Sequence, residues 1–241
     1  MKKRYAFIIL LLVFFFSFGC NNAPVSEQES TIISSENVSK EDFHDIDSFS
    51  YDFSYPLFEV KVDYPEFPEY SKEVNRLIKE EAFSVPYHYY GQELYSSSDN
   101  LLLSISYEVK LKTDNFISIV FRGTGHNKGS TSANYVFYTL NLDLQTMKKV
   151  RLPDRVVIDD ALMDSLIEKI KGTLGPQLNY MFGDSESSEL QAHLLDSDTA
   201  PEGIFSYYTT TAVGICFPVP HAYFETEVPI DEVTLIWAQL W

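Results

Sequence analysis

Cysteine is scarce in this sequence, which has only Cys20 and Cys216 among 241 residues. If Cys20 carries a lipid, Cys216 has no partner for a disulfide within the chain. Cys216 lies in the apolar run Val213–Phe217, so we expect a buried core thiol with no reactive role. With 45% apolar and 15% aromatic residues, the composition is that of a globular protein that builds its core without covalent cross-links.

Basic residues are also few, since 18 Lys and Arg against 35 Asp and Glu give a formal net charge of −17. Lys2, Lys3 and Arg4 belong to a segment that we expect to be removed, and the remaining 15 basic residues leave a charge of −20. Such a surface repels nucleic acid and anionic lipid headgroups and attracts cationic partners over distances that salt shortens. We therefore expect no nucleic-acid partner, although solubility alone is the alternative role of the charge.

The motifs of several enzyme classes are missing. The glycines of Arg122–Ser130 match neither the P-loop nor the dinucleotide fingerprint, and the chain has no Gly-x-Ser-x-Gly elbow. The histidines lack the spacing of metal ligands, so we expect neither a metal nor a cofactor. They are His44, His88, His126, His193 and His221. A catalytic site would have to be assembled by the fold, for example from His126, Asp143 and Asp154.

The N-terminus has the anatomy of a bacterial secretion signal. Basic residues at positions 2–4 precede the apolar run Tyr5–Phe18, which is short for a permanent membrane span. Gly19 directly precedes Cys20, as the lipoprotein signal peptidase requires. We expect residues 1–20 to be a lipoprotein signal peptide and Cys20 to be the lipid-modified end of an exported protein, held on the outer face of a membrane by its anchor only. Cleavage without lipid and an uncleaved anchor are the alternatives.

The rest of the chain divides into a tether and a folded part. Residues 21–47 are rich in Ser, Glu and Asn and show no apolar periodicity, which indicates a flexible tether. The remaining residues fit two closely joined halves, 48–125 and 126–241. Strand and helix patterns occur in both halves, so we expect an α+β fold with antiparallel sheets and a few packed helices.

Alternating apolar residues predict strands over 58–64, 101–111, 116–121 and 135–144. In the last of these, Thr139, Asn141 and Asp143 alternate with apolar residues, and we expect these three on a solvent-exposed face. Another hairpin is predicted over 205–208 and 213–217.

Helical spacing predicts a helix that follows Ser71 as its cap and ends at Pro86. A second helix begins at Asp159 or Asp160, and Gly172 is expected to end it. Two further helices are predicted, at 188–195 and 233–240.

Two stretches are candidate ligand-binding sites. The predicted loop Arg122–Ser130 combines Gly123 and Gly125 with His126, and glycines permit unusual backbone angles beside an imidazole. The second stretch is dense in tyrosine, and side chains of this kind can stack on sugar rings or form a protein-binding patch. Its candidate residues are Tyr87, Tyr89 and Tyr90. A structural connection and simple packing are the respective alternatives.

Several short segments follow one another in a recognisable order from residue 58 to the end. They are Val60–Pro65, Gly123–His126, Tyr138–Leu144, Val150–Asp154, Phe217 with Pro220-His221-Ala222, and Val228-Pro229-Ile230. In this order they resemble an extracytoplasmic bacterial domain family, known from the lysozyme-sensing membrane anti-sigma factor and from the segment preceding certain peptidoglycan deacetylase domains.

The resemblance implies a mixed α+β domain without recognised catalytic residues, which in the anti-sigma relative is the receptor for lysozyme. We therefore expect a non-catalytic, surface-anchored binding lipoprotein of a bacterial cell envelope. Its expected partner is a cationic, lysozyme-like protein or a peptidoglycan fragment. A peptidoglycan- or glycan-acting enzyme with an unrecognised site and a structural spacer are the alternatives. Nothing in the sequence sets the oligomeric state.

We predict that Cys20 becomes the lipid-modified N-terminus, because a small residue precedes it and a polar tether follows. Metabolic labelling with a fatty-acid analogue tests this assignment. The wild-type chain should incorporate the label and the Cys20→Ala variant should not. Equal incorporation by both would show that the anchor is wrongly assigned.

Overall fold

The computed structural model describes residues 46–55, 58–90, 101–127, 133–174, 186–199, 203–219 and 222–236. The predicted signal peptide with Cys20 and nearly all of the predicted tether lie outside these residues. Within the described ranges, no helix is long and apolar enough to cross a membrane. The α+β class expected from the sequence is confirmed, with one six-stranded and one three-stranded sheet.

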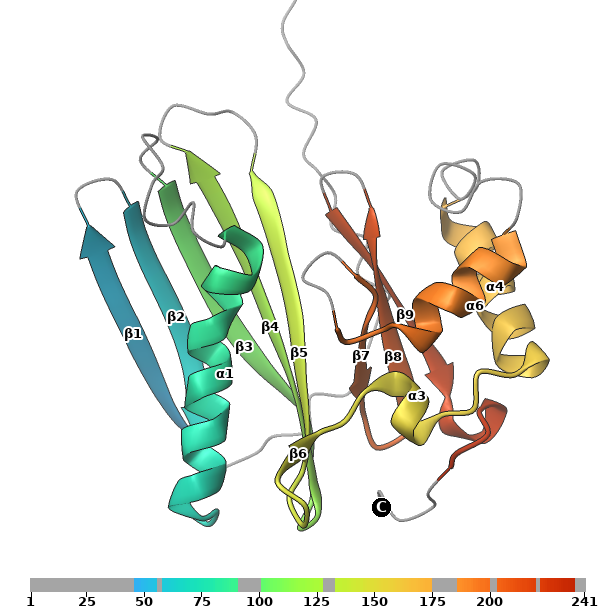
Figure 1. Cartoon of the computed structure of the whole chain (residues 1–241), viewed down its shortest axis with the longest axis horizontal. Coiled ribbons are helices and arrows are strands. Elements are labelled where there is room, and N and C mark those ends of the chain that lie inside the picture. The colour runs from blue at the N-terminus through green and yellow to red at the C-terminus, as the bar shows by residue number, and fades with distance from the viewer. Residues whose placement is uncertain are drawn as a thin grey trace, which may run out of the picture. The chain divides into compact units, whose positions relative to one another are not determined.

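The six-stranded sheet has its strands in chain order (Figure 1). They are β1 (Asp47–Tyr55), β2 (Phe58–Glu66), β3 (Leu101–Lys112), β4 (Phe116–Asn127), β5 (Asn134–Asp143) and β6 (Lys148–Lys149). All neighbours are antiparallel except β2 and β3, which are parallel. This pair corrects the expectation of purely antiparallel sheets, and it arises because the helix α1 (Lys72–Tyr90) lies between the two strands in the chain. The expected division between two halves at residue 125 falls within β4 and stays a prediction.

Helix α1 packs on one face of this sheet, where its apolar stripe meets the inward-facing residues of the strands. Ser71 caps it, since its hydroxyl accepts a hydrogen bond from the Val74 amide at 3.3 Å. The expectation that Pro86 ends the helix is wrong. Proline removes one backbone hydrogen bond, but Val85 and Pro86 are buried and Tyr89 anchors the next turn, so packing outweighs the loss and the helix continues to Tyr90.

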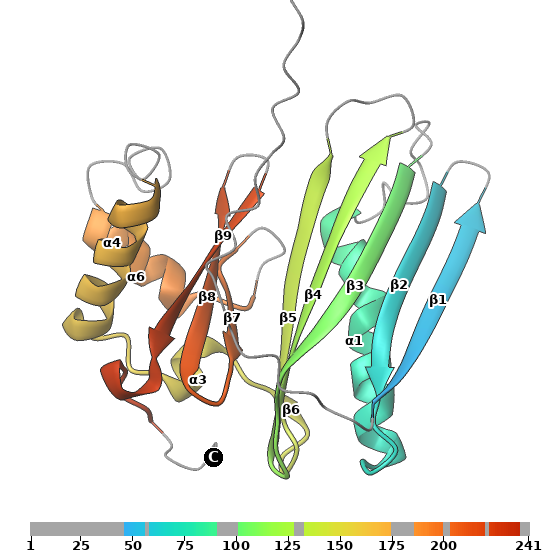
Figure 2. The ribbon, with the colours of Figure 1, turned by 180° about the vertical axis from the view of Figure 1, so that it is seen from behind.

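The second sheet packs its own core against three helices. Its strands are β7 (Phe205–Tyr208), β8 (Ala212–Val219) and β9 (Ala222–Pro229), and the helices are α3 (Leu152–Arg155), α4 (Asp160–Leu174) and α6 (Glu186–Leu195). Figure 2 shows α4 and α6 beside this sheet. The predicted hairpin and both predicted helices are confirmed, and Cys216 is a buried free thiol.

One predicted helix boundary and one predicted helix in this part of the chain are wrong. Gly172 does not end α4, because an exposed glycine costs a helix only about 1 kcal/mol and the helix continues to Leu174. The predicted terminal helix is absent from its described part, residues 233–236. There Leu235 pairs with Val156 in an isolated antiparallel bridge after the short 3-10 helix η1 (Ile230–Glu232).

The expectation that Thr139, Asn141 and Asp143 face solvent is also wrong. Thr139 and Asn141 are buried, and Asp143 is half-buried in an ion pair with Arg155. Asn141 joins the two sheets, because it accepts a hydrogen bond from the Ser118 hydroxyl at 2.7 Å and donates one to the Ser206 carbonyl at 2.8 Å. The alternating pattern predicted that this face of the six-stranded sheet is exposed to solvent. The second sheet instead covers it over β4 and β5.

Asp198 is the most heavily bonded carboxylate of this interface. It accepts hydrogen bonds from the Ser206 amide and hydroxyl, both at 2.7 Å, from the Leu152 amide at 2.9 Å and from the Thr139 hydroxyl at 3.2 Å. These groups belong to β7, α3 and β5. The Asp198 backbone has a φ of 61°, a left-handed conformation that Asp tolerates better than most residues.

We predict that Asp198 makes stability depend on pH. Burial raises its pKa from 3.8 to about 6, although the four hydrogen bonds oppose the shift. The folded state then binds this proton more tightly than the unfolded chain. The contribution of the protonated carboxyl to the free energy of unfolding is therefore complete below about pH 4 and is lost as pH rises through 6. The full difference is about 3 kcal/mol.

Urea unfolding of the wild type and of Asp198→Asn across this pH range measures the effect. The contributions of the other carboxylates cancel when the free energies of unfolding of the two proteins are subtracted. The wild type should lose stability relative to Asp198→Asn as pH rises from 4 to 7, by about 1–3 kcal/mol. A difference that is constant, or that grows in favour of the wild type, would contradict the prediction.

Candidate functional site

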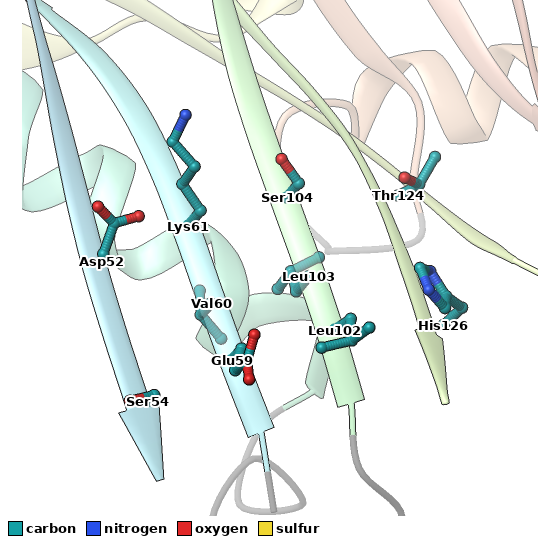
Figure 3. A pocket seen from close by; sticks show the side chains of 10 residues that line it. All are labelled: Asp52, Ser54, Glu59, Val60, Lys61, Leu102, Leu103, Ser104, Thr124 and His126. Atoms are coloured by element: carbon teal, nitrogen blue, oxygen red, sulfur yellow. The ribbon is translucent and has the colours of Figure 1, made fainter. Parts of the chain in front are cut away.

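The face of the six-stranded sheet opposite α1 is only partly covered. Over β1–β4 it carries a groove of about 570 Å³, which we call the open-face groove. Its side chains form two rows across the strands, since the strand register places residues of one row opposite one another. The first row is Asp52, Lys61, Ser104 and Thr124, and the second is Ser54, Glu59, Leu102 and His126. Figure 3 shows these residues on neighbouring strands.

The groove carries charged groups of both signs, but they differ in their partners. Lys61 forms an ion pair with Asp63 at 3.3 Å. Among the described residues, neither Asp52 nor Glu59 forms an ion pair, although Lys61 stands directly opposite Asp52 in the strand register, and both carboxylates are exposed. The two carboxylates are diagonal neighbours on adjacent strands, a spacing of about 7–8 Å. These two carboxylates and the Lys61 ammonium share the β1–β2 end of the groove.

His126 is the one predicted site residue that lines this groove. The prediction of a loop over Arg122–Ser130 is wrong for residues 122–127, which continue β4 to Asn127. Residues 128–130 lie outside the described part of the chain. The two glycines interrupt the alternating pattern of β4, and glycine is depleted in strands, so the sequence favoured a loop here.

Gly123 and Gly125 lie on the α1 side of β4, opposite the groove, where the chain passes other atoms closely. A Cβ at Gly123 would lie 2.4 Å from the Ser104 carbonyl oxygen, and one at Gly125 would lie 1.9 Å from the Tyr90 hydroxyl. Both glycines thus serve close packing. The structure brings Gly125 and Tyr90 together from two stretches that the sequence analysis treated separately.

The three candidate tyrosines have different surroundings. Tyr87 is 52% exposed. Tyr89 is held in place, since its hydroxyl lies 2.8 Å from the Tyr223 hydroxyl and accepts a hydrogen bond from the Phe137 amide at 3.2 Å. Burial raises the pKa of Tyr89 and of Tyr90.

Tyr89 and Tyr90 line a second hollow of about 400 Å³, which we call the tyrosine cleft. It lies between the end of α1, the start of β5 and the β8–β9 hairpin. Its remaining lining residues are Asn134, Tyr135, Pro218, Val219, Ala222 and Tyr223. The six candidate residues therefore divide between two hollows, two close-packing positions and one exposed ring, and their role in binding stays a prediction.

The three residues that would mark a hidden catalytic site do not converge. Phe116, at the start of β4, pairs with Asp143, and His126 lies ten residues further along the strand, about 33 Å away at 3.3 Å per residue. The Asp154 carboxylate accepts a hydrogen bond from the Arg151 amide at 2.9 Å and so caps α3. Within the described ranges, no group of three or more His, Cys, Asp or Glu residues is placed to hold a metal ion.

No family model matches the sequence, and no curated protein matches it either. The fold is similar to that of a DUF3298 family protein. A crystal structure of a DUF3298 member from Bacteroides fragilis is 13% identical, with 78% of this chain and 90% of that chain aligned at a TM-score of 0.51. A DUF3298 protein from Pseudomonas aeruginosa is also 13% identical, with 78% and 94% aligned at a TM-score of 0.47. The likeness to the Bacteroides protein concerns the fold alone, and the link to the lysozyme-sensing anti-sigma factor stays a prediction.

We predict that Gly125→Ala destabilises the protein and that Tyr90→Phe partly reverses the loss. The new Cβ would overlap the Tyr90 hydroxyl, and forced repacking of this kind costs about 1–3 kcal/mol. Removing that hydroxyl relieves the overlap. Gly123→Ala is the control, since its obstacle is a backbone carbonyl that Tyr90→Phe leaves in place.

Chemical unfolding of the wild type, the three single variants and the two double variants, analysed as two double-mutant cycles, measures the coupling. Rescue of Gly125→Ala but not of Gly123→Ala is expected. Equal effects of Tyr90→Phe on both glycine variants would show that Gly125 and Tyr90 do not pack as described.

Proposed function

We propose that this chain is an exported, lipid-anchored binding protein of a bacterial cell envelope, and that its open-face groove captures a cationic protein. One observation carries the choice of partner. Asp52 and Glu59 are exposed, form no ion pair among the described residues and lie as diagonal neighbours on one side of the groove, where Lys61 is already paired with Asp63. A lysine or arginine side chain of a partner fits between two such carboxylates.

Lysozyme is the candidate partner that the sequence resemblance supplies. The acidic composition supports this choice, because attraction between oppositely charged surfaces raises the rate of encounter. The signal-like N-terminus supports a location outside the cytoplasm, where such a partner is met.

A fragment of the cell wall is the second candidate ligand, and the tyrosine cleft favours it. Tyrosine rings stack on the apolar faces of sugars, while hydroxyl and amide groups bond the sugar hydroxyls. The cleft offers Tyr90, Tyr135 and Tyr223 together with the amide of Asn134. Its volume of about 400 Å³ is within the range of small-ligand sites.

We predict that Asp52→Asn with Glu59→Gln weakens binding of lysozyme by the full chain, mainly through a several-fold slower association at low ionic strength. The loss should shrink in high salt, which screens exposed charges. Surface plasmon resonance at two ionic strengths measures both rate constants. Asp164→Asn with Glu168→Gln on α4 is the matched control, since both residues are exposed and the change in net charge is the same.

Equal losses in the two double variants would show that total charge, and not the groove, attracts the partner. Absence of lysozyme binding by the folded wild type would contradict the proposed partner. Binding of wall fragments that is lost in Tyr135→Ala would then favour the second ligand.

A further inference from the structure

Strand β1 forms an unprotected edge of the six-stranded sheet. It stands first in the strand order and pairs only with β2, through nine consecutive antiparallel pairs without a bulge. No described residue pairs with its outer edge, and both views show β1 outermost (Figures 1 and 2). Its free backbone groups are a template for another strand.

Natural edge strands usually carry devices that block such pairing, and β1 carries few of them. Its sequence, Asp47–Tyr55, contains no lysine, no proline and no glycine, and it is nine residues long. Lysine, proline, bulges and short length are the common protections of an edge. Asp52 is the only charged residue in the interior of the strand, so the edge repels acidic partners and accepts basic ones.

The aromatic residues of β1 extend the apolar face of the sheet beyond α1. Tyr51 stacks on Phe83 of α1 at 4.1 Å between ring centroids, and Phe49 stacks on Tyr64 at 6.0 Å. Phe49 nevertheless remains 42% exposed and Tyr51 37% exposed. Apolar side chains of a neighbouring strand would cover this surface, as cross-strand pairs do inside a sheet.

The opposite face of β1 has another character. Ser50, Asp52 and Ser54 are exposed there, and Asp52 and Ser54 line the open-face groove. A strand added beside β1 would thus have apolar side chains on one face and basic or hydroxyl side chains on the other. Successive side chains of a strand point to opposite faces, so the sequence of the added strand should alternate between these two kinds of residue.

We propose that β1 binds an extended segment of another protein by strand addition, and that this segment alternates apolar and basic residues. The inference goes beyond the proposed function, because it concerns the edge of the sheet and a segment in extended conformation. A second copy of this chain is the competing occupant. Charge disfavours it, since each copy brings the same excess of 35 acidic over 18 basic residues.

A pair of synthetic peptides tests the proposal with the full chain in mild detergent. The first is a nonapeptide of alternating valine and lysine, with alternate amides methylated on one edge to prevent self-association. The second has the same composition and methylation number but groups its lysines at one end. Hydrogen exchange of the β1 amides and fluorescence anisotropy of labelled peptide are the readouts.

The alternating peptide should slow exchange at Asp47–Tyr55 and bind at least about threefold more tightly than the grouped peptide, because several cross-strand pairs form together only with the alternating sequence. The Asp52→Lys variant should bind the alternating peptide more weakly than the wild type does, while Asp164→Lys on α4 should bind it equally well. Both variants should keep the wild-type circular dichroism.

Equal binding of the two peptides without protection of β1 would overturn the proposal, because charge alone would then explain binding. Protection of β1 that rises with protein concentration in the absence of peptide would overturn it in favour of a second copy. A folded wild-type chain that binds no lysozyme but shows protection of β1 by the alternating peptide would contradict the proposed function alone, so the two proposals fail separately.

Discussion

The buried carboxylate of Asp198 needs hydrogen-bond donors, and the arrangement of the fold provides them from three elements. Thr139 of β5, Leu152 of α3 and Ser206 of β7 all donate to it. A buried carboxylate without partners costs several kcal/mol, so any displacement of β7 or α3 is penalised. Ser118 and Asn141 add a second set of buried hydrogen bonds, and Ser118 accepts one from the Tyr208 amide at 3.0 Å. These contacts fix the second sheet over β4 and β5.

The second sheet therefore covers one part of this face of the six-stranded sheet and leaves the other part exposed to solvent. Arg122 lies at the boundary of the covered part, where its guanidinium bonds Glu225 of β9 and Glu108 of β3, each at 2.6 Å. Beyond it, the polar side chains of β1–β3 remain open to solvent. The groove, with Asp52 and Glu59, and the free edge of β1 both belong to this open part. The buried polar contacts that join the sheets therefore also decide which surface is left for a partner.

Most elements were predictable because one face of each is apolar. Strands β2 to β5 and helix α4 follow period two or the helical period, and Asp159 caps α4 through the Leu162 amide at 3.0 Å. Strand β1 was missed although Ser48–Tyr55 alternates throughout, and with it the groove residue Asp52. Asn141 and Asp198 could not be recognised, because a buried polar residue and an exposed one look alike in sequence until the covering element is known. The positions of Gly125 and Tyr90 likewise depend on contacts between distant segments.

Native-state hydrogen exchange as a function of denaturant tests most directly whether the buried polar contacts make the two sheets one cooperative unit. The amides of Leu152, Ser206 and Tyr208 donate to Asp198 or Ser118, whereas the Ile119 amide belongs to the centre of β4. All four should exchange through the same global opening, with one free energy and one denaturant dependence. Exchange of Leu152, Ser206 and Tyr208 through a separate opening of clearly lower free energy, with Ile119 still protected, would contradict a single cooperative unit.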